Sequence, residues 1–336
     1  MLNLNEIPEP IASFLSYKRV IQNRSKLTVE EYFNDLRTFF RYIYAIRQNG
    51  DTSDLTKYDI SDLDYDTISG VSTEDIYSFL LFEAEDKKND SASRARKLSA
   101  IKSFYKYLTV KSGKLKNNPA KDIESPKKPK QLPKYLSLDE SITLLNSVQK
   151  GSEHYYRDYC IITLFLNCGM RLSELCGINL TDVESDFSKL TVTGKGNKTR
   201  VIYLNDACKS ALSLYLMARQ KEASAPGFVL KDKNALFISG RGNRISNKTV
   251  QWMINKHLEL AGLSGKGYST HKLRHTAATL MYGSGKVDVR VLKDILGHEQ
   301  LNTTQIYTHI SDSQMKAAMD NNPLSNISNK KDKSDD

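Results

Sequence analysis

Apolar residues recur every three or four positions through much of the first third of the chain. In the clearest run, between about residues 10 and 47, the recurring side chains are Tyr32, Leu36, Phe39, Phe40, Ile43 and Tyr44. This period puts them on one face of a helix that faces a core. Thr28 and Glu31 fit the capping pattern that begins a helix, and another helix is expected from Thr73 onward. The pattern predicts a helical N-terminal domain.

A further helical pattern, over residues 91–110, carries a basic face. Leu98, Ile101, Tyr105 and Leu108 would face the core, and the opposite side is cationic. A basic face is often simply solvated, but in a basic protein it also suits contact with phosphates. The candidates for DNA contact on this helix are Arg94, Arg96, Lys97, Lys102 and Lys106.

Residues 50–72 interrupt the helices with closely spaced aspartates among serine, threonine and glycine. We expect an acidic loop here. Spaced carboxylates could hold a metal ion, but this run lacks the glycine and the final glutamate of a calcium-binding loop.

Prolines divide the chain after residue 118. Pro119, Pro126, Pro129 and Pro133 are interleaved with lysines, and prolines cannot continue a helix and stiffen a linker. We place a basic linker at residues 125–134, where Lys127 and Lys128 are further candidates for DNA contact.

A second domain is expected beyond the linker. A helix over 154–168 should end at Gly169, with a short helix over 171–177 after it. Lys189–Thr193 and Arg200–Leu204 alternate as strands do, and Gly194–Lys198 would form the turn between them. Helices return until about residue 320, and the polar segment 325–336 is expected to be disordered. The predicted fold class is mainly α with a small β-sheet.

Composition narrows the class of partner. The 336 residues carry a net charge of +10 with a pI of about 9.2, which favours a polyanion such as nucleic acid. No apolar run reaches the roughly 18 residues of a membrane span, and no signal peptide is recognisable. The 4 cysteines form no C-x-x-C pair, so we expect reduced thiols in a cytoplasmic protein rather than a zinc site.

Cleavage of a phosphodiester by a side chain requires positive charge at the phosphate and a proton for the leaving oxygen. Arg171 begins a short helix, where backbone N–H groups also favour anions, and its planar fork can bind two phosphate oxygens. Glu174 could hold that guanidinium, although a pair at this spacing is usually a surface salt bridge. Lys195 lies in the turn between the strands and could protonate a leaving oxygen, with Lys198 and Arg200 as competing positions.

Histidines gather near the C-terminus. His271 and Arg274 are three apart on a predicted helix, so both can face one target, whereas His275 is expected to point elsewhere and to be structural. His298 follows an amphipathic run that ends at Gly297. His271 and His275 also have the spacing of zinc ligands, but the cation at Arg274 argues against a metal between them.

Tyr307 is one of 18 tyrosines and is singled out by its position after this cluster. A free phenol has a pKa of about 10. Neighbouring cations would favour the phenolate, which is a usable nucleophile.

Four segments together resemble the tyrosine recombinases of the phage integrase family, most closely the bacterial Xer type. They are Cys168–Leu175, Thr193–Lys198, His271–His275 and Leu296–His309, and the likeness extends to Ser93–Leu108 and Asn118–Ala120. The resemblance implies a two-domain DNA clamp, with an N-terminal SAM-like core-binding domain at 1–124 and an α+β catalytic domain at 135–324. Cys168 and Met170 replace the threonine and leucine that are common there, which we expect to be harmless.

The resemblance also implies a role for each site residue. Arg171 and Arg274 would bind the scissile phosphate, Lys195 would be the general acid toward the 5′ oxygen, and His271 would assist proton transfer.

In the same comparison His298 would hydrogen-bond the phosphate, and Tyr307 would attack it and form a 3′-phosphotyrosyl link. Because that link stores the energy of the broken bond, no metal, ATP or other cofactor is implied.

The partner implied is double-stranded DNA with a short inverted-repeat site, recombined through a Holliday junction by a homotetramer or by a heterotetramer with a paralogue. A C-terminal helix near residues 315–327 would pack on a neighbouring subunit, or else on its own domain. Arg241, Arg244 and Gln251 are candidates for contacts to bases.

The expected task is resolution of chromosome or plasmid dimers, as part of chromosome partition at cell division. An integrase or transposase of a mobile element is the main alternative, because the acidic loop 50–72 lengthens the N-terminal domain. A type IB topoisomerase shares the chemistry but acts as a monomer. A DNA-binding factor without catalysis is disfavoured by the complete set of site residues.

Overall fold

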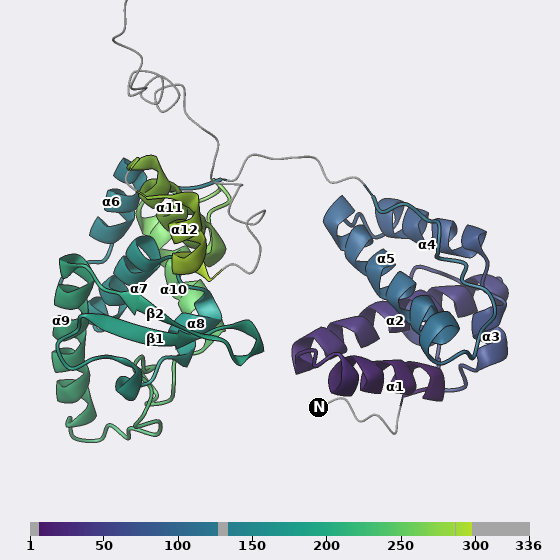
Figure 1. The fold of residues 1–336 in the computed structure, drawn as a ribbon, viewed down its shortest axis with the longest axis horizontal. Helices are drawn as coiled ribbons and strands as arrows, with labels where there is room; N and C mark the ends of the chain where they lie inside the picture. The colour runs from purple at the N-terminus through teal and green to yellow at the C-terminus, as the bar shows by residue number, and fades with distance from the viewer. Residues whose placement is uncertain (1–6, 127–133, 286, 298–336) are drawn as a thin grey trace, which may run out of the picture. The chain divides into compact units, whose positions relative to one another are not determined.

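The computed structural model describes residues 7–126, 134–285 and 287–297, and of Lys195 it describes the backbone. The chain divides into two compact units, Met1–Lys130 and Gln131–Asp336 (Figure 1). The described part is mostly helical with one small antiparallel sheet, as the sequence predicted. In that part, none of the helices combines the length and the apolar character that crossing a membrane requires.

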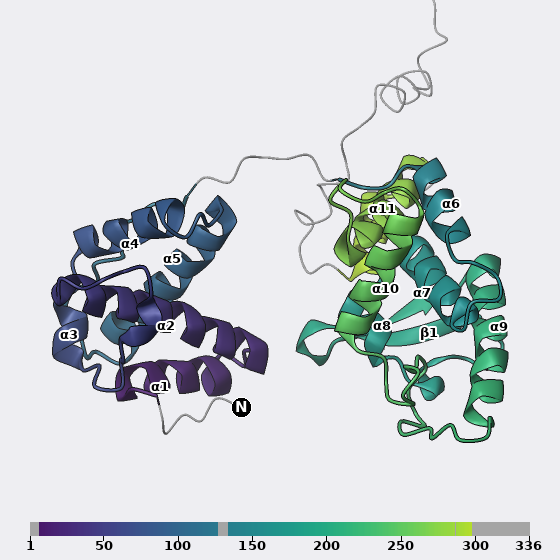
Figure 2. The same ribbon diagram turned by 180° about the vertical axis from the view of Figure 1, so that it is seen from behind.

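The first unit is made of helices. Its α-helices are α1 Glu9–Ser16, α2 Lys26–Arg47, α3 Tyr65–Ser69, α4 Thr73–Glu85 and α5 Ser91–Lys106. The π-helical turns Tyr17–Ile21 and Tyr107–Lys111 extend α1 and α5, and a 3-10 turn spans Leu55–Lys57. Helices α2, α4 and α5 pack on one another, as Figures 1 and 2 show from opposite sides.

Helix α2 begins earlier than the sequence pattern suggested. Its N-cap is Ser25, whose hydroxyl accepts a hydrogen bond of 3.2 Å from the Thr28 backbone N–H. The prediction that Thr28 and Glu31 cap this helix is therefore wrong. Ser25 and Thr28 are also three apart, so the first polar residue before the apolar stripe was the better candidate.

Aromatic rings fill the core of the first unit. Phe14, Phe39, Phe40, Phe79 and Phe104 are fully buried. They form a chain of contacts with centroids 5.0–5.7 Å apart where α1, α2, α4 and α5 meet. The stripe read from the sequence of α2 is thus a core-facing stripe.

Four aspartates of residues 50–72 form hydrogen bonds with the backbone of their own segment. Asp51, Asp54, Asp59 and Asp64 each accept a hydrogen bond from a backbone N–H two or three residues later. Such turns account for the spacing of these carboxylates. The segment also holds two short helical turns, so it is more structured than the loop that the sequence predicted.

The second unit combines helices with a β-hairpin. Its elements are α6 Leu138–Asn146, α7 Tyr155–Cys168, α8 Leu172–Gly177, β1 Lys189–Thr193, β2 Thr199–Tyr203, α9 Asp206–Ala223, α10 Asn247–Leu260, α11 Thr270–Gly283 and α12 Val289–Leu296.

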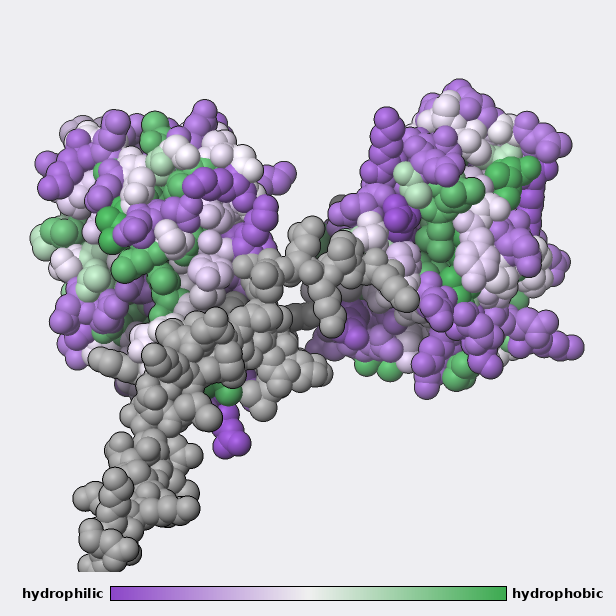
Figure 3. Space-filling view, turned by 90° about the horizontal axis from the view of Figure 1, so that it is seen from above, coloured by the Kyte–Doolittle hydropathy of each residue, from purple (hydrophilic) through white to green (hydrophobic). Residues whose placement is uncertain are grey.

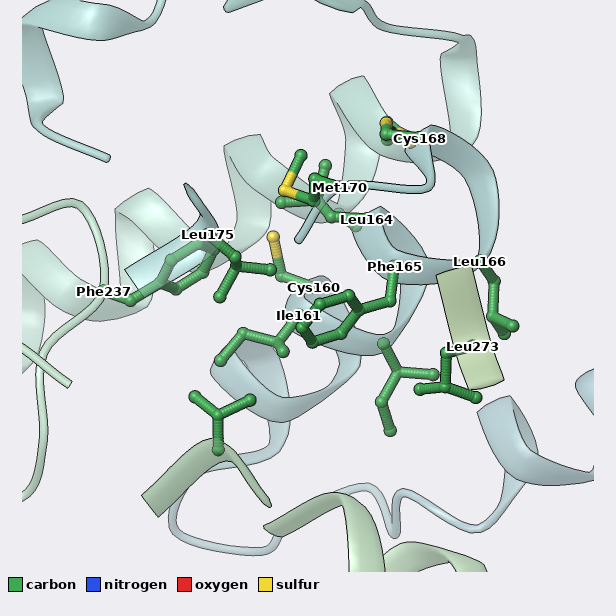
Figure 4. Packing of buried hydrophobic residues seen from close by; sticks show 14 of the residues in the cluster. Cys160, Ile161, Leu164, Phe165, Leu166, Cys168, Met170, Leu175, Phe237 and Leu273 are labelled. Carbon is green, nitrogen blue, oxygen red and sulfur yellow. Dashed lines mark hydrogen bonds between the residues drawn. The ribbon is translucent and has the colours of Figure 1, made fainter. Parts of the chain in front are cut away.

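Helix α7 is the centre of this unit. Most of its residues are buried, including Cys160 and Cys168, which pack as small apolar side chains. Helices α9 and α11 lie against it. Figure 4 shows its side chains meeting those of Met170, Phe237 and Leu273 in one apolar cluster. A helix buried on several sides gives a rigid base for the residues that follow it.

The hairpin has the two strands and the turn that the sequence predicted, with β2 beginning one residue earlier, at Thr199. Leu190 pairs with Ile202 and Val192 pairs with Arg200. A 3-10 turn, Lys195–Asn197, joins the strands, and the Gly194 N–H donates to the Lys198 carbonyl at 2.7 Å. This places the backbone of Lys195 at the turn, as the sequence indicated.

The surface in view in Figure 3 is mostly hydrophilic, with smaller hydrophobic areas on both units. Exposed apolar side chains include Leu27 and Val110 in the first unit, and Leu138 and Trp252 in the second. Scattered apolar residues of this kind are normal on a soluble surface.

The capping assignment can be tested in solution. Replacing Ser25 with alanine removes the acceptor for the Thr28 N–H, which should cost about 1 kcal/mol of local helix stability. Hydrogen exchange of the first turn of α2 should then be about fivefold faster. Thr28→Ala is the matched control and should have the smaller effect. The reverse order of the two variants would contradict the assignment.

Candidate active site

A glycine turn places Arg171 at the beginning of α8. Helix α7 ends at Gly169, whose backbone is left-handed with φ of 58°. A Cβ there would lie 2.8 Å from the Leu296 side chain, so glycine also permits a close approach of α12. Arg171 follows two residues later as the N-cap of α8.

Glu174 is buried and holds Arg171 at two points. One carboxylate oxygen accepts from the Arg171 guanidinium at 2.6 Å, and the other accepts from the Arg171 backbone N–H at 2.7 Å. Glu174 is 1% exposed. The pair is therefore a buried structural element and not the surface salt bridge that its spacing usually indicates.

Arg200 is the second cation on this carboxylate. From strand β2 it donates to both oxygens of Glu174, at 2.6 and 3.0 Å. Burial raises the pKa of Glu174, but the hydrogen bonds and charges of Arg200 and Arg171 outweigh it and hold the pKa below its ordinary value. Glu174 is thus an anion at neutral pH.

Arg274 approaches from α11. Its guanidinium lies 3.9 Å from a Glu174 oxygen, and its side chain is 3% exposed. It donates to the Gly169 carbonyl at 2.9 Å and to the Leu296 carbonyl at 2.6 Å. The structure thus brings Arg171 and Arg274, both predicted site residues, together around one carboxylate.

The C-terminal end of α12 closes this arginine cluster. Three consecutive carbonyls, of Ile295, Leu296 and Gly297, accept hydrogen bonds from Arg200, Arg274 and Arg171 at 3.0, 2.6 and 3.0 Å. The last carbonyls of a helix have no partner within it and carry partial negative charge. Three arginines therefore satisfy the end of the helix from which the chain continues to His298.

The turn between the strands lies beside the same carboxylate. A Cβ on Gly194 would be 3.1 Å from a Glu174 oxygen and 3.6 Å from an Arg171 nitrogen. The backbone of Lys195 is therefore next to the arginine cluster.

His271 and His275 occupy neighbouring turns of α11. Their rings meet edge to face with centroids 4.5 Å apart. His275 was expected to point elsewhere and to be structural: its ring lies against that of His271, four residues earlier on the helix, and it is buried. Burial, together with the nearby positive charges of His271, Lys272 and Arg274, lowers the pKa of His275 to about 4. Partial burial and Arg274 also lower the pKa of His271, so both rings are neutral at pH 7.

Two predicted site residues, His298 and Tyr307, lie outside the described residues. Among the side chains that are described, no group of three or more histidines, cysteines, aspartates or glutamates is placed to hold a metal ion.

The predicted DNA-contacting residues of α5 differ in their surroundings. Arg96 bonds to Glu31 and Asp35 at 2.9 and 2.5 Å, and Lys97 pairs with the buried Glu83 at 3.2 Å. These partners support the fold of the first unit. Arg94 donates to the Asn89 carbonyl, Lys102 is half-buried and Lys106 is exposed.

The remaining candidates lie near the start of α10 or in the linker. Arg241 and Gln251 are exposed. Arg244 donates to Asp232, to the Asn179 side chain and to two backbone carbonyls, so its guanidinium is engaged in the fold. Lys127 and Lys128 lie outside the described residues.

The role of Arg200 was the main feature that sequence reasoning missed. Arg200 pairs directly with Val192, which is buried, so both face the interior side of the hairpin. A charged residue at an inward position of an alternating strand is a signal for a buried ionic partner. Nothing comparable in the sequence indicated that the three carbonyls at the end of α12 would accept hydrogen bonds from arginines.

The charges of this cluster suit it to bind an anion. Three guanidinium groups surround one carboxylate, which leaves an excess of about two positive charges (three minus one) where α8, α11 and the hairpin turn meet. Arg171 is the most accessible of the three, with its side chain 35% exposed. A phosphate group, with several oxygens and negative charge, has the matching chemistry.

Comparison with known proteins agrees with this chemistry. Residues 134–314 match the phage integrase family, and residues 56–112 match the phage integrase N-terminal SAM-like domain. A tyrosine recombinase XerC from Caldanaerobacter subterraneus subsp. tengcongensis is 49% identical over 95% of this chain and 88% of its own length. The chain belongs to the phage integrase family of tyrosine recombinases. It is a Xer-like site-specific recombinase, an enzyme that cleaves and rejoins DNA strands.

Other relatives extend the match. A tyrosine recombinase XerC from Thermodesulfovibrio yellowstonii is 34% identical over 89% of this recombinase and 91% of its own length. A XerH recombinase bound to its difH substrate shares the fold with a TM-score of 0.66, at 21% identity over 92% of this chain and 82% of that one. A lambda integrase dimer bound to a COC′ core site gives 0.60, at 19% identity over 87% and 96% of the two chains.

The neutral histidines predict how the recombinase responds to acid. The folded-state pKa of His275, about 4, lies below its ordinary value near 6.5, so between these pH values the unfolded chain binds more protons. The free energy of unfolding should therefore fall as pH decreases from about 6.5 to about 4. Urea denaturation at pH 7, 6 and 5 should show a shallower fall for His275→Gln than for the original chain. Equal falls in the two proteins would contradict a lowered pKa for His275.

Proposed function

We propose that this recombinase resolves chromosome or plasmid dimers at a short inverted-repeat site in double-stranded DNA. The arginine cluster around Glu174 is the observation that carries the proposal, because it offers an anion-binding centre beside the turn that bears Lys195. The relatives named XerC, at 49% and 34% identity, favour this task over integration of a mobile element. Such an enzyme works on chromosomal DNA, so we place it in the cytoplasm.

Strand cleavage follows from the proposed roles. Arg171 and Arg274 bind the nonbridging oxygens of the scissile phosphate. The hydroxyl oxygen of Tyr307 attacks phosphorus, forming a bond between tyrosine and the 3′ phosphate while the bond to the 5′ oxygen breaks. Lys195 gives a proton to that leaving oxygen. His271, neutral at pH 7, can accept the tyrosine proton, and His298 donates a hydrogen bond to the phosphate.

Rejoining reverses these steps. The 5′ hydroxyl of the partner strand attacks the phosphotyrosine and gives its proton to Lys195, while the tyrosine oxygen leaves and takes back the proton held by His271. The number of phosphodiester bonds is unchanged, so no external energy source is needed. Arginine supplies to the phosphate the positive charge that a metal ion supplies in other nucleases.

We propose that the two units form a clamp around DNA, with a core-binding domain at 1–124, a linker at 125–134 and a catalytic domain at 135–324. XerH is described as bound to difH DNA before cleavage, which supports a DNA partner here. Four copies, or two copies each of this chain and a paralogue, would bring two sites together through a Holliday junction. The segment 315–327, outside the described residues, would join neighbouring subunits.

The nucleophile can be identified directly. Tyr307→Phe removes the attacking oxygen without removing a cation, so a nicked target DNA should give no covalent protein–DNA adduct with this variant. DNA affinity, measured by fluorescence anisotropy, should stay within about threefold because the phosphate contacts remain. Adduct formation by Tyr307→Phe at the original rate would overturn the assignment.

Independence from metal ions is a second test. With charge on the phosphate supplied by Arg171 and Arg274, adduct formation should proceed at an unchanged rate in excess EDTA. Loss of cleavage in EDTA, with recovery on addition of Mg²⁺, would refute the proposed mechanism.

A further inference from the structure

Arg200 is more buried than Arg171 and uses its whole guanidinium within the protein. Each of its three nitrogens donates within the protein: Nη1 and Nη2 to the two oxygens of Glu174, and Nε to the Ile295 carbonyl at 3.0 Å. Its side chain is 14% exposed, between 35% for Arg171 and 3% for Arg274. Because all three of its nitrogens already donate to protein oxygens, Arg200 is placed to hold those groups and not a phosphate.

The first group it holds is the carboxylate that orients Arg171. One Glu174 oxygen accepts from both Arg171 and Arg200, each at 2.6 Å, so the two guanidinium groups share it. Arg274 stands 3.9 Å from the other oxygen. Without Arg200, the carboxylate could rotate toward Arg274, and the positions of both phosphate-binding arginines would change.

The second group it holds is the end of α12. Besides the bond to Ile295, the aliphatic part of Arg200 lies beneath Gly297, where a Cβ would be 3.0 Å from its Cδ. Gly297 has a left-handed backbone with φ of 65° and is followed in sequence by His298. Arg200 thus fixes the point at which the chain leaves α12 toward His298 and Tyr307.

We propose that Arg200 is a positioning residue for strand cleavage, which sets the orientation of Glu174 and the end of α12 and does not itself contact DNA. This inference rests on the proposed function, because it assigns Arg200 to the same reaction. Reacting groups must be placed to well within 1 Å, and a misplacement of that size can cost about 100-fold in rate. Arg200 should accordingly affect the rate of cleavage and leave DNA binding nearly unchanged.

The test compares two variants of Arg200 in the full-length protein. Arg200→Gln removes the charge and the fork, and Arg200→Lys keeps the charge but cannot bond to both Glu174 oxygens and Ile295 together. The readouts are the single-turnover rate of adduct formation on saturating nicked DNA, the Kd for that DNA, and the melting temperature. Arg200→Gln should lose at least about tenfold in rate with Kd within about threefold, and Arg200→Lys should recover part of the rate.

Arg219→Gln is the matched control. Arg219 on α9 is also a buried arginine, and it donates to the Lys233 and Ala235 carbonyls at 3.3 and 2.9 Å. Its loss should lower the melting temperature while leaving the cleavage rate of the folded protein unchanged. If the control and Arg200→Gln lose rate equally, Arg200 is merely structural and the inference fails.

The remaining outcomes are also decisive. Cleavage at the original rate by folded Arg200→Gln, or full recovery by Arg200→Lys, would overturn the positioning role. If Arg200→Gln does not fold, the rate of Arg200→Lys decides: a reduced rate at saturating DNA supports the role and an unchanged rate refutes it. Absence of an adduct with the original chain would instead count against the proposed function itself.

Discussion

The second unit depends on one ionic interaction, the burial of the Glu174 carboxylate among arginines. Taking a carboxylate out of water costs several kcal/mol unless hydrogen bonds and opposite charges replace the solvent. In this unit Arg171 and Arg200 supply four hydrogen bonds to its two oxygens, and Arg274 adds a third cation nearby. Because the arginines share one carboxylate, the loss of any group would change the hydrogen bonds of the others. The remaining positive excess makes the cluster a centre for binding an anion.

The fold serves to bring these groups together from distant parts of the sequence. Helix α7 is a buried support, and the left-handed turn at Gly169 directs the chain so that Arg171 starts α8. The hairpin delivers Arg200 and the backbone of Lys195 to the same carboxylate. Helix α12 ends on the arginines with its last carbonyls. The arginine cluster that we propose binds the phosphate is thus joined by hydrogen bonds to the end of α12, from which the chain continues toward Tyr307.

Sequence patterns were sufficient for the elements and for part of the site. Apolar periodicity found the helices and the hairpin, and the spacing of Arg171 from Glu174 indicated their contact. The capping pattern indicated the wrong N-cap for α2, because Ser25 and Thr28 are three residues apart just as Thr28 and Glu31 are. It also failed at Arg200, whose partner is 26 residues away, and at the carbonyls of α12, which have no side-chain signature. Such contacts arise from tertiary packing, which local spacing cannot encode.

The role of Glu174 in organising the arginines for cleavage is tested most directly by Glu174→Gln. This substitution keeps the size and shape of the side chain and removes its charge. The measurement is the single-turnover rate of adduct formation with the variant saturated by nicked DNA, corrected for the folded fraction. We expect a loss on the order of 100-fold with little change in Kd. Cleavage at the rate of the original chain would contradict this role.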